Sequence, residues 1–461
     1  MTKENLMEKV VSLCKRRGFV YPGSEIYGGL ANTWDYGPLG IELKKNIQDA
    51  WWNFFVRSRL DMVGLDAAVL MNPKVWAASG HVTCFNDAMV DCKECKSRFR
   101  ADHLIEDAVD GIKVEGLEPK DLDKLIKSNK IKCPKCGSTN FTPARVFNLL
   151  FQTYIGPVAE DSSPVYLRGE LAQSMFVDFK QILETSRKKI PFGIAQVGKC
   201  FRNEITPGNF IFRTIEFDLM EFEYFVKEEE WEKWFDYWLD QMKKWLDIVG
   251  IDSKRTKVRE HDKDELSHYS KRTVDIEFET PFGWKELYGC AYRTNFDLSN
   301  HQEHSGKDLQ YFDPETNEKF VPHVIEPTFG LTRSVLMVLL SAYEEETVKD
   351  AKGNAETRVV LKLNKNIAPF KVAVLPLVNK LNDKAKELWG KLSPHFSTDF
   401  DTTGSIGKRY RRQDEIGTPY CITFDFDSLE DNSVTVRDRD TMEQERVKIN
   451  KLQEYLAKKL A

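Results

Sequence analysis

The sequence has no long apolar run. Its start, MTKEN, is polar, and no stretch of its 461 residues approaches the eighteen or so apolar residues of a membrane span. The apolar segment of a secretory signal peptide is missing as well. We therefore expect a cytoplasmic protein without membrane contacts.

The chain also has little net charge and an odd number of cysteines. Its 67 Lys and Arg residues nearly balance its 72 Asp and Glu residues, which leaves a formal net charge of −5. Any nucleic acid must then be bound by local basic patches, because no global positive field attracts it. Nine cysteines in a chain without an export signal argue against a disulfide framework and leave metal binding or plain burial.

Enough apolar material is present for a substantial core. With 41% hydrophobic and 30% charged residues, a chain of this length should hold two or three domains. Shifts in composition divide it into an N-terminal part at 1–90, a charged insertion at 91–147, a core at 148–364 and a C-terminal domain at 365–461. A large multidomain enzyme fits this organisation.

Residues 198–226, GKCFRNEITPGNFIFRTIEFDLMEFEYFV, predict an antiparallel β-hairpin around the turn residues 206–209, TPGN. Alternation along the strands puts charged and aromatic side chains on shared faces: Arg202 and Glu204 on the first strand, and Arg213, Phe217 and Glu221 on the second. If the loop is symmetric, Glu204 lies opposite Arg213. A row of cation, aromatic ring and carboxylate suits a nucleotide. An exposed hairpin with cross-strand ion pairs is the alternative.

Apolar patterns predict the other elements of the first two thirds of the chain. Residues 19–40 are rich in Gly and aromatics, which is typical of a loop close to a ligand or partner. The helix that begins at Pro38 carries one apolar stripe to about Arg57: Leu43, Ile47, Trp51 and Phe54 or Phe55. We also expect helices at 4–17, 173–189 and 231–249, strands at 65–71, 273–279 and 284–293, and a polar loop at 299–320. The segment 261–269, HDKDELSHY, invites a metal interpretation, which we reject in favour of a solvated loop.

The insertion carries two Cys-x-x-Cys pairs, Cys92 with Cys95 and Cys133 with Cys136. Each pair can bind one face of a tetrahedral ion through two thiolates. The long gap between the pairs can hold a helix near 121–127. A structural Zn²⁺ site is therefore predicted, with four free thiols or a redox pair as alternatives. A catalytic zinc does not fit, because four cysteines leave no open coordination position.

The last part of the chain predicts a separate α/β domain. Its expected elements alternate as a strand at 372–377, a helix at 380–392 and strands at 421–426 and 433–438. Residues 407–412, GKRYRR, place four cations around one aromatic ring. That composition suits phosphate contacts and base stacking on single-stranded RNA, and a solvated turn is the alternative.

These motifs resemble those of class II aminoacyl-tRNA synthetases. The pattern F-R-x-E, a loop, then R-x-x-x-F-x-x-x-E, at residues 201–221, is similar to motif 2 of that family. Residues 325–333, IEPTFGLTR, resemble motif 3, a strand that turns into a buried helix. The helix and strand between Pro38 and Pro73 are similar to motif 1, through which the family pairs its subunits. The run GSEIYGGLANTWDYGPLG, followed by NPKVWAASGH, resembles the homodimeric glycyl-tRNA synthetases.

The resemblance implies an α+β fold: the class II synthetase antiparallel sheet with flanking helices, a zinc-knuckle insertion and a C-terminal α/β anticodon-binding domain. It implies a glycine–tRNA ligase that uses ATP and Mg²⁺ to form glycyl-adenylate and transfers the glycyl group to tRNA(Gly). A homodimer and a structural Zn²⁺ would accompany this activity. The rivals are another synthetase of the same subgroup, a non-catalytic tRNA- or DNA-binding protein on the same fold, and a zinc-dependent hydrolase.

The resemblance also assigns site residues. The catalytic residues would be Arg202, Glu204 and Arg333. The ATP-binding set would be Arg202, Asn203, Glu204, Phe212, Arg213, Thr214, Ile215, Glu216, Phe217, Glu286, Leu287, Gly330, Leu331, Thr332 and Arg333. The substrate-binding set would be Arg100, Glu170, Phe217, Asp218, Leu219, Met220, Glu221, Glu326, Pro327, Thr328, Phe329 and Gly330. The metal ligands would be Cys92, Cys95, Cys133 and Cys136.

Four positions depart from the family pattern. Gly169 and Leu171 stand where glycyl-tRNA synthetases have Pro and Thr, Ile215 stands where relatives often have Arg, and Asn295 stands where Asp is common. Glycine loosens the backbone that positions Glu170, and leucine removes a hydroxyl group. These departures bear on how strongly glycine and ATP bind.

Overall fold

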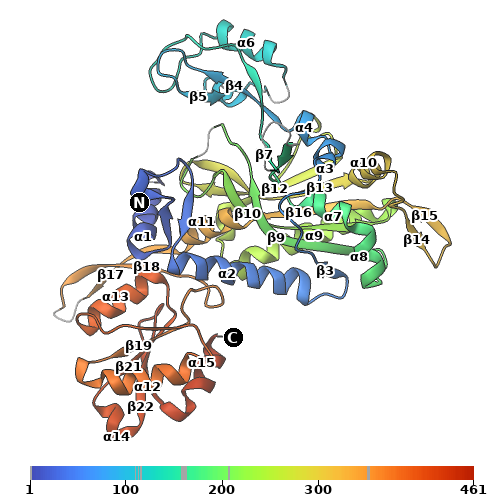
Figure 1. Ribbon diagram of the computed structural model, residues 1–461. Helices are drawn as coiled ribbons and strands as arrows, with labels where there is room; N and C mark the ends of the chain where they lie inside the picture. Colours follow the sequence, from blue (N-terminus) through green and yellow to red (C-terminus); the bar gives the residue numbers. More distant parts are fainter. Residues whose placement is uncertain are drawn as a thin grey trace.

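The computed structural model describes residues 3–109, 111, 112, 114, 117–156, 164–205, 208–349 and 353–460. Figure 1 shows a central body with the insertion above it and the C-terminal domain below it. Within those ranges no helix combines the length and the apolar character that crossing a membrane requires. The predicted α+β class is confirmed.

A seven-stranded sheet forms the centre of the body, in the order β11-β12-β13-β16-β10-β9-β3. Neighbouring strands are antiparallel, apart from the parallel pair β3 and β9. The strands are β3 (Met62–Gly64), β9 (Phe192–Phe201), β10 (Glu216–Val226), β11 (Thr256–Glu260), β12 (Arg272–Thr280), β13 (Gly283–Thr294) and β16 (His323–Gly330). Two-stranded pairs border it: β1 (Val20–Pro22) with β2 (Trp34–Tyr36), β7 (Gln152–Tyr154) with β8 (Pro164–Tyr166), β14 (Tyr311–Asp313) with β15 (Glu318–Phe320), and β17 (Tyr343–Lys349) with β18 (Ala355–Leu361).

Helices cover both faces of this sheet. On one face lie α2 (Pro38–Trp52) with its π-helical continuation η2 (Asn53–Arg57), α9 (Trp231–Val249) and α11 (Leu331–Ala342). On the other lie α7 (Ala172–Val177), α8 (Phe179–Ser186) and α10 (Phe296–Ser305). The body is completed by α1 (Lys3–Arg17), α3 (Pro73–Ala78), α4 (His81–Cys84) and the 3-10 turns η1 (Glu25–Tyr27), η3 (Glu228–Glu230), η4 (Ser253–Arg255) and η5 (Lys263–Glu265).

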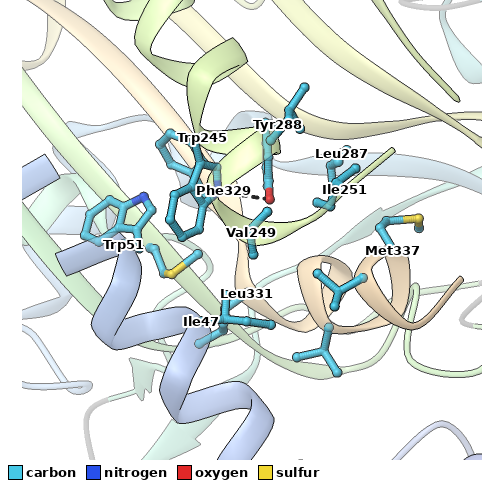
Figure 2. Packing of buried hydrophobic residues seen from close by; sticks show 14 of the residues in the cluster. Ile47, Trp51, Trp245, Val249, Ile251, Leu287, Tyr288, Phe329, Leu331 and Met337 are labelled. Carbon is cyan, nitrogen blue, oxygen red and sulfur yellow. Dashed lines mark hydrogen bonds between the residues drawn. The ribbon is translucent and has the colours of Figure 1, made fainter. Parts of the chain in front are cut away.

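The face toward α2, α9 and α11 is packed with aromatic rings (Figure 2). Successive residues of a strand point to opposite faces, so the even-numbered residues 220–226 of β10 enter this core. The rings of Trp51 and Phe329 lie 5.7 Å apart, and Trp245 Nε1 donates to Tyr288 Oη at 3.2 Å. The apolar stripe predicted for the Pro38 helix is buried here, which confirms it.

The odd-numbered residues of β10 point to the opposite face. Leu219 and Phe225 pack there against α7 and α8, but Glu221 and Glu223 lie between them. Both glutamates are buried, with 2% and 0% of their surface exposed. Burying a carboxylate is costly unless it is paired or protonated, so this part of the sheet is a site rather than a core.

The predicted hairpin is β9 and β10, but its loop is longer than expected. The strands end at the pair Phe201 and Glu216, so Arg202, Glu204 and Arg213 lie in the connecting loop rather than on strands. Arg213 bridges to Gly208 instead of standing opposite Glu204. The reason is local: Asn209 and Phe210 have φ values of 57° and 59°, which coil this side of the loop. Thr206 and Pro207 of the predicted turn lie outside the described residues.

Two predictions of local structure are wrong. The strand expected at 65–71 is replaced by β3, and Asn72 then caps α3 by accepting a hydrogen bond from the Lys74 N–H. The segment expected to be a polar loop at 299–320 contains α10 and the β14–β15 hairpin. Buried Leu309 and Tyr311 anchor it to the α7 core, so a few apolar residues suffice to order a polar segment.

The insertion is a three-stranded sheet, in the order β5-β4-β6, with its own hydrophobic core. Its elements are β4 (Asn86–Asp91), β5 (Arg98–Arg100), α5 (Ala101–Glu106), α6 (Pro119–Ser128) and β6 (Arg145–Asn148). The helix expected at 121–127 lies within α6, which confirms it.

The C-terminal domain is a five-stranded sheet with helices, in the order β20-β19-β21-β22-β23. Strand β19 is parallel to β20 and β21, and the remaining pairs are antiparallel. The predicted alternation of strands and helix is confirmed. Its elements are β19 (Val372–Pro376), η6 (Asn379–Leu381), α12 (Asn382–Leu392), β20 (Thr398–Phe400), α13 (Ile406–Ile416), β21 (Tyr420–Phe424), α14 (Asp427–Asp431), β22 (Ser433–Asp438), β23 (Gln444–Lys448), η7 (Ile449–Lys451) and α15 (Leu452–Leu460).

The GKRYRR segment forms part of α13 and is used inside the protein, so neither an RNA-stacking surface nor a solvated turn describes it. Arg409 is 2% exposed and donates to the backbone carbonyls of Pro376, Thr402 and Gly404. Arg412 binds Asp401. Hydrogen bonds within the domain therefore hold the guanidinium groups of Arg409 and Arg412.

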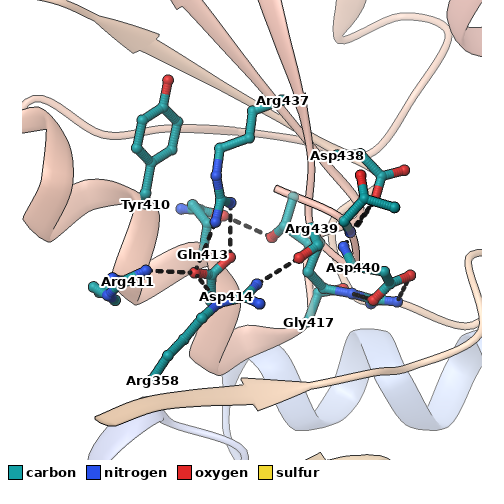
Figure 3. A network of polar contacts seen from close by, with 12 residues as sticks. Arg358, Tyr410, Arg411, Gln413, Asp414, Gly417, Arg437, Asp438, Arg439 and Asp440 are labelled. Atoms are coloured by element: carbon teal, nitrogen blue, oxygen red, sulfur yellow. Dashed lines mark hydrogen bonds and ion pairs between the residues drawn. The ribbon is translucent and has the colours of Figure 1, made fainter. Parts of the chain in front are cut away.

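Buried Asp414 joins three arginines from different elements (Figure 3). It accepts hydrogen bonds from Arg358 Nε at 2.8 Å, from Arg437 Nη1 at 2.8 Å and from Arg411 Nη1 at 3.4 Å. Arg358 lies on β18, so the network ties the β17–β18 hairpin to the C-terminal domain. Burial alone would raise the pKa of Asp414, but Arg358 and Arg437 together lower it.

We predict that Asp414→Asn lowers the free energy of opening of α13 and β21 by about 3–5 kcal/mol, because three guanidinium groups lose their shared counter-ion. A depressed folded-state pKa means that this stabilisation is fully present above the unfolded pKa of about 3.9 and is lost as the pH falls below it and through the lower folded-state pKa of Asp414. Hydrogen exchange of α13 and β21 amides at pH 7 measures the loss. Glu387→Gln, at a Glu that is 59% exposed and pairs with the similarly exposed Lys384, is the control and should cost under about 1 kcal/mol. Equal losses in the two variants would contradict the prediction.

Candidate active site

A cavity of about 730 Å³ lies over the central strands of the sheet. It brings together residues that are far apart in the sequence, from the insertion, the β9–β10 loop, β10, β13, β16 and the start of α11. The sequence-predicted residues that line it are Arg100, Glu170, Arg202, Glu204, Phe212, Arg213, Thr214, Phe217, Asp218, Leu219, Glu221, Glu286, Leu287, Glu326, Thr328, Gly330, Thr332 and Arg333.

The other predicted site residues are outside the cavity lining: Asn203, Ile215, Glu216, Met220, Pro327, Phe329 and Leu331. Strand alternation accounts for most of them. Met220 and Phe329 point to the opposite face and lie in the main hydrophobic core, as Leu331 does. Glu216 is exposed and pairs with Lys199. Met220, Phe329 and Leu331 therefore support the cavity from the core side of the sheet.

One end of the cavity is cationic. Arg202 lies over the rings of Phe85 and Phe217, at 5.1 and 5.5 Å from their centroids, and its Nε donates to the Gly169 carbonyl at 3.1 Å. Burial lowers the pKa of Arg213, and the nearby Arg333 lowers it further while Glu204 opposes them. Cations that repel one another in this way make a site for an anion.

Arg333, at the start of α11, is held in place by two neighbours. Its Nη1 lies 3.2 Å from Glu286 Oε2 and donates to the Glu286 carbonyl at 3.1 Å, and its guanidinium lies 4.8 Å from the Phe212 ring centroid. The charge of Arg333 lowers the pKa of Glu286, so that carboxylate is ionised. An ionised carboxylate beside a phosphate-sized cationic pocket can also receive a divalent cation.

The other end of the cavity is acidic. Thr328 Oγ1 donates to Glu221 Oε1 at 2.7 Å, and the Leu171 N–H donates to Glu221 Oε2 at 3.0 Å. Burial and the charge of Glu170 nevertheless raise the pKa of Glu221 to about 7. Burial also raises the pKa of Glu326 to about 8, with Glu221 adding to it and Arg293 opposing it. This end can hold a small cation.

Arg293 is the buried counter-ion of the acidic end and was not among the predicted site residues. It is 1% exposed, donates to both oxygens of Asp297 at 2.8 Å and to Glu326 Oε1 at 2.8 Å, and lies over the Tyr269 ring at 3.8 Å. Its sequence neighbourhood, Arg-Thr-Asn at the end of a strand, resembles many exposed strand ends. Only its position against Asp297 and Glu326 reveals its role.

His81 is a second site residue missed by the sequence reasoning. Its Nε2 lies 3.2 Å from Glu170 Oε2, and its Nδ1 shares a hydrogen bond of 2.8 Å with Ser79 Oγ. Burial alone would raise the pKa of Glu170, but His81, Arg293 and Gln173 lower it below its usual range. Glu170 is therefore ionised. The run NPKVWAASGH was the only available signal, because it ends at His81.

The segment 261–269 is more than a solvated loop. His261, Glu265, His268 and Tyr269 line the cavity on the side of Arg293. Among the residues that the structure describes, this segment contributes to no group of metal-ligating side chains.

The four predicted metal ligands of the insertion come together. The Sγ atoms of Cys92 and Cys136 lie 3.6 Å apart, as do those of Cys95 and Cys133, and all four sulfurs lie within 4.8 Å of one another. Four thiolates bound to one tetrahedral Zn²⁺ at about 2.3 Å would be about 3.8 Å apart. The donor set thus fits a zinc ion.

Comparisons with known proteins agree with this geometry. The family described as "tRNA synthetase class II core domain (G, H, P, S and T)" matches residues 161–343, "Anticodon binding domain" matches 371–459 and "Glycyl-tRNA synthetase insertion domain 1" matches 87–119. The glycine–tRNA ligase of Geobacillus thermodenitrificans is 56% identical over 99% of this chain and 98% of its own. That of Alkaliphilus oremlandii is 55% identical over the full length of both. That of Bacillus cereus is 56% identical over 98% of this chain and 99% of its own.

Proposed function

This chain belongs to the glycine–tRNA ligase family of class II aminoacyl-tRNA synthetases, and from that premise we propose how its cavity joins glycine to tRNA(Gly) with ATP. The observation that carries the proposal is the division of one cavity into a cationic end around Arg202 and Arg213 and an acidic end around Glu221. ATP is an anion and the glycine ammonium is a cation. The two ends therefore fit the two substrates of the first step.

In the first step, a glycine carboxylate oxygen attacks the α-phosphorus of ATP in line, and pyrophosphate leaves with the electrons of the broken P–O bond. Arg202 would bind the α-phosphate, while Arg213 and Arg333 would bind the outer phosphates and Phe217 would contact adenine. No side chain acts as a nucleophile. Catalysis is positioning and charge neutralisation, as in other phosphate chemistry of this type.

In the second step, a terminal ribose hydroxyl of tRNA(Gly) attacks the carbonyl carbon of glycyl-adenylate, and AMP leaves. Glu286 and Glu204 are the residues that would hold Mg²⁺. When bound there, the ion would supply further neutralisation of phosphate charge. The domain at 371–459 would bind the anticodon side of the tRNA.

Glycine would be held at the acidic end by Glu170, Glu221 and Glu326, with Thr328 beside them. Three carboxyl groups around a small pocket bind the ammonium and fill the volume that a side chain would need. Rejection of larger amino acids is then steric, so no editing site is required. A non-catalytic binding protein has no observation in its favour, since it would not need the arginines of the cationic end.

We predict that Arg202→Lys lowers glycine-dependent exchange of pyrophosphate into ATP by about 100-fold or more, because a planar, two-pronged phosphate contact is lost. The fold should be retained. Arg187→Lys, on the exposed end of α8, is the matched control and should leave the exchange unchanged. Exchange within a few-fold of the parent in the Arg202 variant would show that this residue does not bind the reacting phosphate.

We propose that the four cysteines of the insertion hold one structural Zn²⁺ per chain. Elemental analysis of protein prepared without chelator should find close to one zinc, and Cys133→Ser combined with Cys136→Ser should release it. Glycine activation should fall only indirectly. Cys84→Ser, at an exposed cysteine outside the group, is the control and should keep the metal. Absence of zinc from the parent protein would overturn the assignment.

We propose that the chain works as a homodimer in the cytoplasm, where its nine free thiols stay reduced. The loop after β1 exposes large apolar side chains: Ile26 is 90% exposed, Tyr27 87% and Leu30 61%. Surfaces of this kind are covered in an interface.

Light scattering should then give twice the 53.4 kDa of one chain. Tyr27→Asp should reduce this mass to that of a monomer, because the charge would be buried without a partner. Tyr154→Asp, at a tyrosine that is 57% exposed elsewhere, should leave the dimer intact. A monomeric parent would contradict the proposal.

A further inference from the structure

Glu223 is a buried carboxyl group that the reaction described above does not use. It is 0% exposed and lies two residues from Glu221 on β10, behind the cavity rather than on its lining. Among the described residues, no N–H or O–H group donates a hydrogen bond to either of its carboxyl oxygens. A buried polar group without a partner is rare and requires an explanation.

The surroundings of Glu223 favour its neutral form. An ionised carboxylate without donors would cost several kcal/mol in such a place, and protonation removes that cost. The charged groups that face it are Glu221 on its own strand, Glu326 on β16, Arg293 on β13 and Asp297 on α10. Burial and the charge of Glu326 raise the pKa of Glu223 well above its usual value, and Arg293 only partly opposes this.

A neutral carboxylic acid is a hydrogen-bond donor, and Glu326 is placed to accept. The pairs Glu221 with Thr328 and Tyr224 with Ile325 put Glu223 directly across from Glu326 in the β10–β16 ladder. Carboxyl oxygens of Glu221, Glu223 and Glu326 lie within 4.8 Å of one another. A small side-chain rotation can close that gap.

Glu326 needs such a donor to ionise near neutral pH, because burial and the neighbouring glutamates raise its pKa to about 8. Arg293 Nη1 contacts its Oε1 at 2.8 Å, which leaves the second carboxyl oxygen without that support. A hydrogen bond to the charged form of an acid favours that form. The O–H of Glu223 would therefore lower the pKa of Glu326, as Arg293 does.

We propose that Glu223 is a positioning residue for glycine: it stays protonated, donates its O–H to Glu326, and so favours the anionic form of Glu326 that binds the glycine ammonium. The proposal rests on the glycine pocket assigned above. It adds a residue that touches Glu326 and never the substrate.

The test compares Glu223→Leu with Glu223→Gln. Leucine removes the donor, so the pKa of Glu326 should rise and the acid limb of kcat/KM for glycine in pyrophosphate exchange should move to higher pH by about one unit. The loss at pH 7 would be about tenfold and would fade toward pH 9. Glutamine keeps an N–H donor, so its profile should stay within about threefold of the parent at every pH. KM for ATP should be unchanged in both variants.

Each outcome has one meaning. A parent protein without glycine-dependent exchange would refute the proposed function itself. An active parent whose profile superimposes on that of the Leu variant would refute only the role of Glu223. A loss of tenfold or more in the Gln variant at all pH values would show that Glu223 binds the ammonium as an anion, and this arm decides the question even where the Leu variant is too unstable to assay.

Discussion

The ion pairs of Arg293 are the constraint on which the acidic end of the cavity depends. Four carboxyl groups from β10, β16 and α10 converge in a space from which water is largely excluded, and their mutual repulsion would otherwise force them to protonate or the strands to separate. Arg293 neutralises Asp297 and Glu326 with three hydrogen bonds and rests on the Tyr269 ring. The remaining carboxyl groups, Glu221 and Glu223, then stay buried with raised pKa values.

This arrangement separates the two charges that the reaction brings together. The arginines come from the β9–β10 loop and the start of α11, whereas the glutamates come from the middle of β10 and β16. Because the arginines lie beyond the ends of the strands and the glutamates lie along β10 and β16, the two sets face one cavity without neutralising one another. An anionic nucleotide and the ammonium group of an amino acid can each bind at its own end.

Local patterns in the sequence were sufficient for much of the fold. The Pro38 helix, the aromatic helix α9, the β9–β10 pairing and the elements of the C-terminal domain follow from apolar periodicity and turn residues. Most of the residues that the family motifs assign to the site line the cavity. Some residues of the motifs, such as Met220, do not line the cavity, because successive residues of a strand point to opposite faces.

Contacts between charged residues distant in the sequence could not be predicted. His81 meets Glu170 and Arg293 meets Glu326 only after the sheet has formed, and no hydrophobic pattern marks a charged residue that will be buried. The GKRYRR segment gave the opposite error. Its composition predicted exposed cations, yet acidic and carbonyl groups of the same domain surround Arg409 and Arg412.

The departures at Gly169 and Leu171 can be understood from the same geometry. Leu171 is 0% exposed and packs in the core of α7, and only its backbone N–H reaches Glu221. A hydroxyl on that side chain would face the core rather than the glycine pocket. A Cβ at position 169 would stand 3.2 Å from the Phe85 ring, over which Arg202 lies. Glycine at this position leaves room for the Phe85 ring against the backbone, while the Gly169 carbonyl accepts the hydrogen bond from Arg202 Nε.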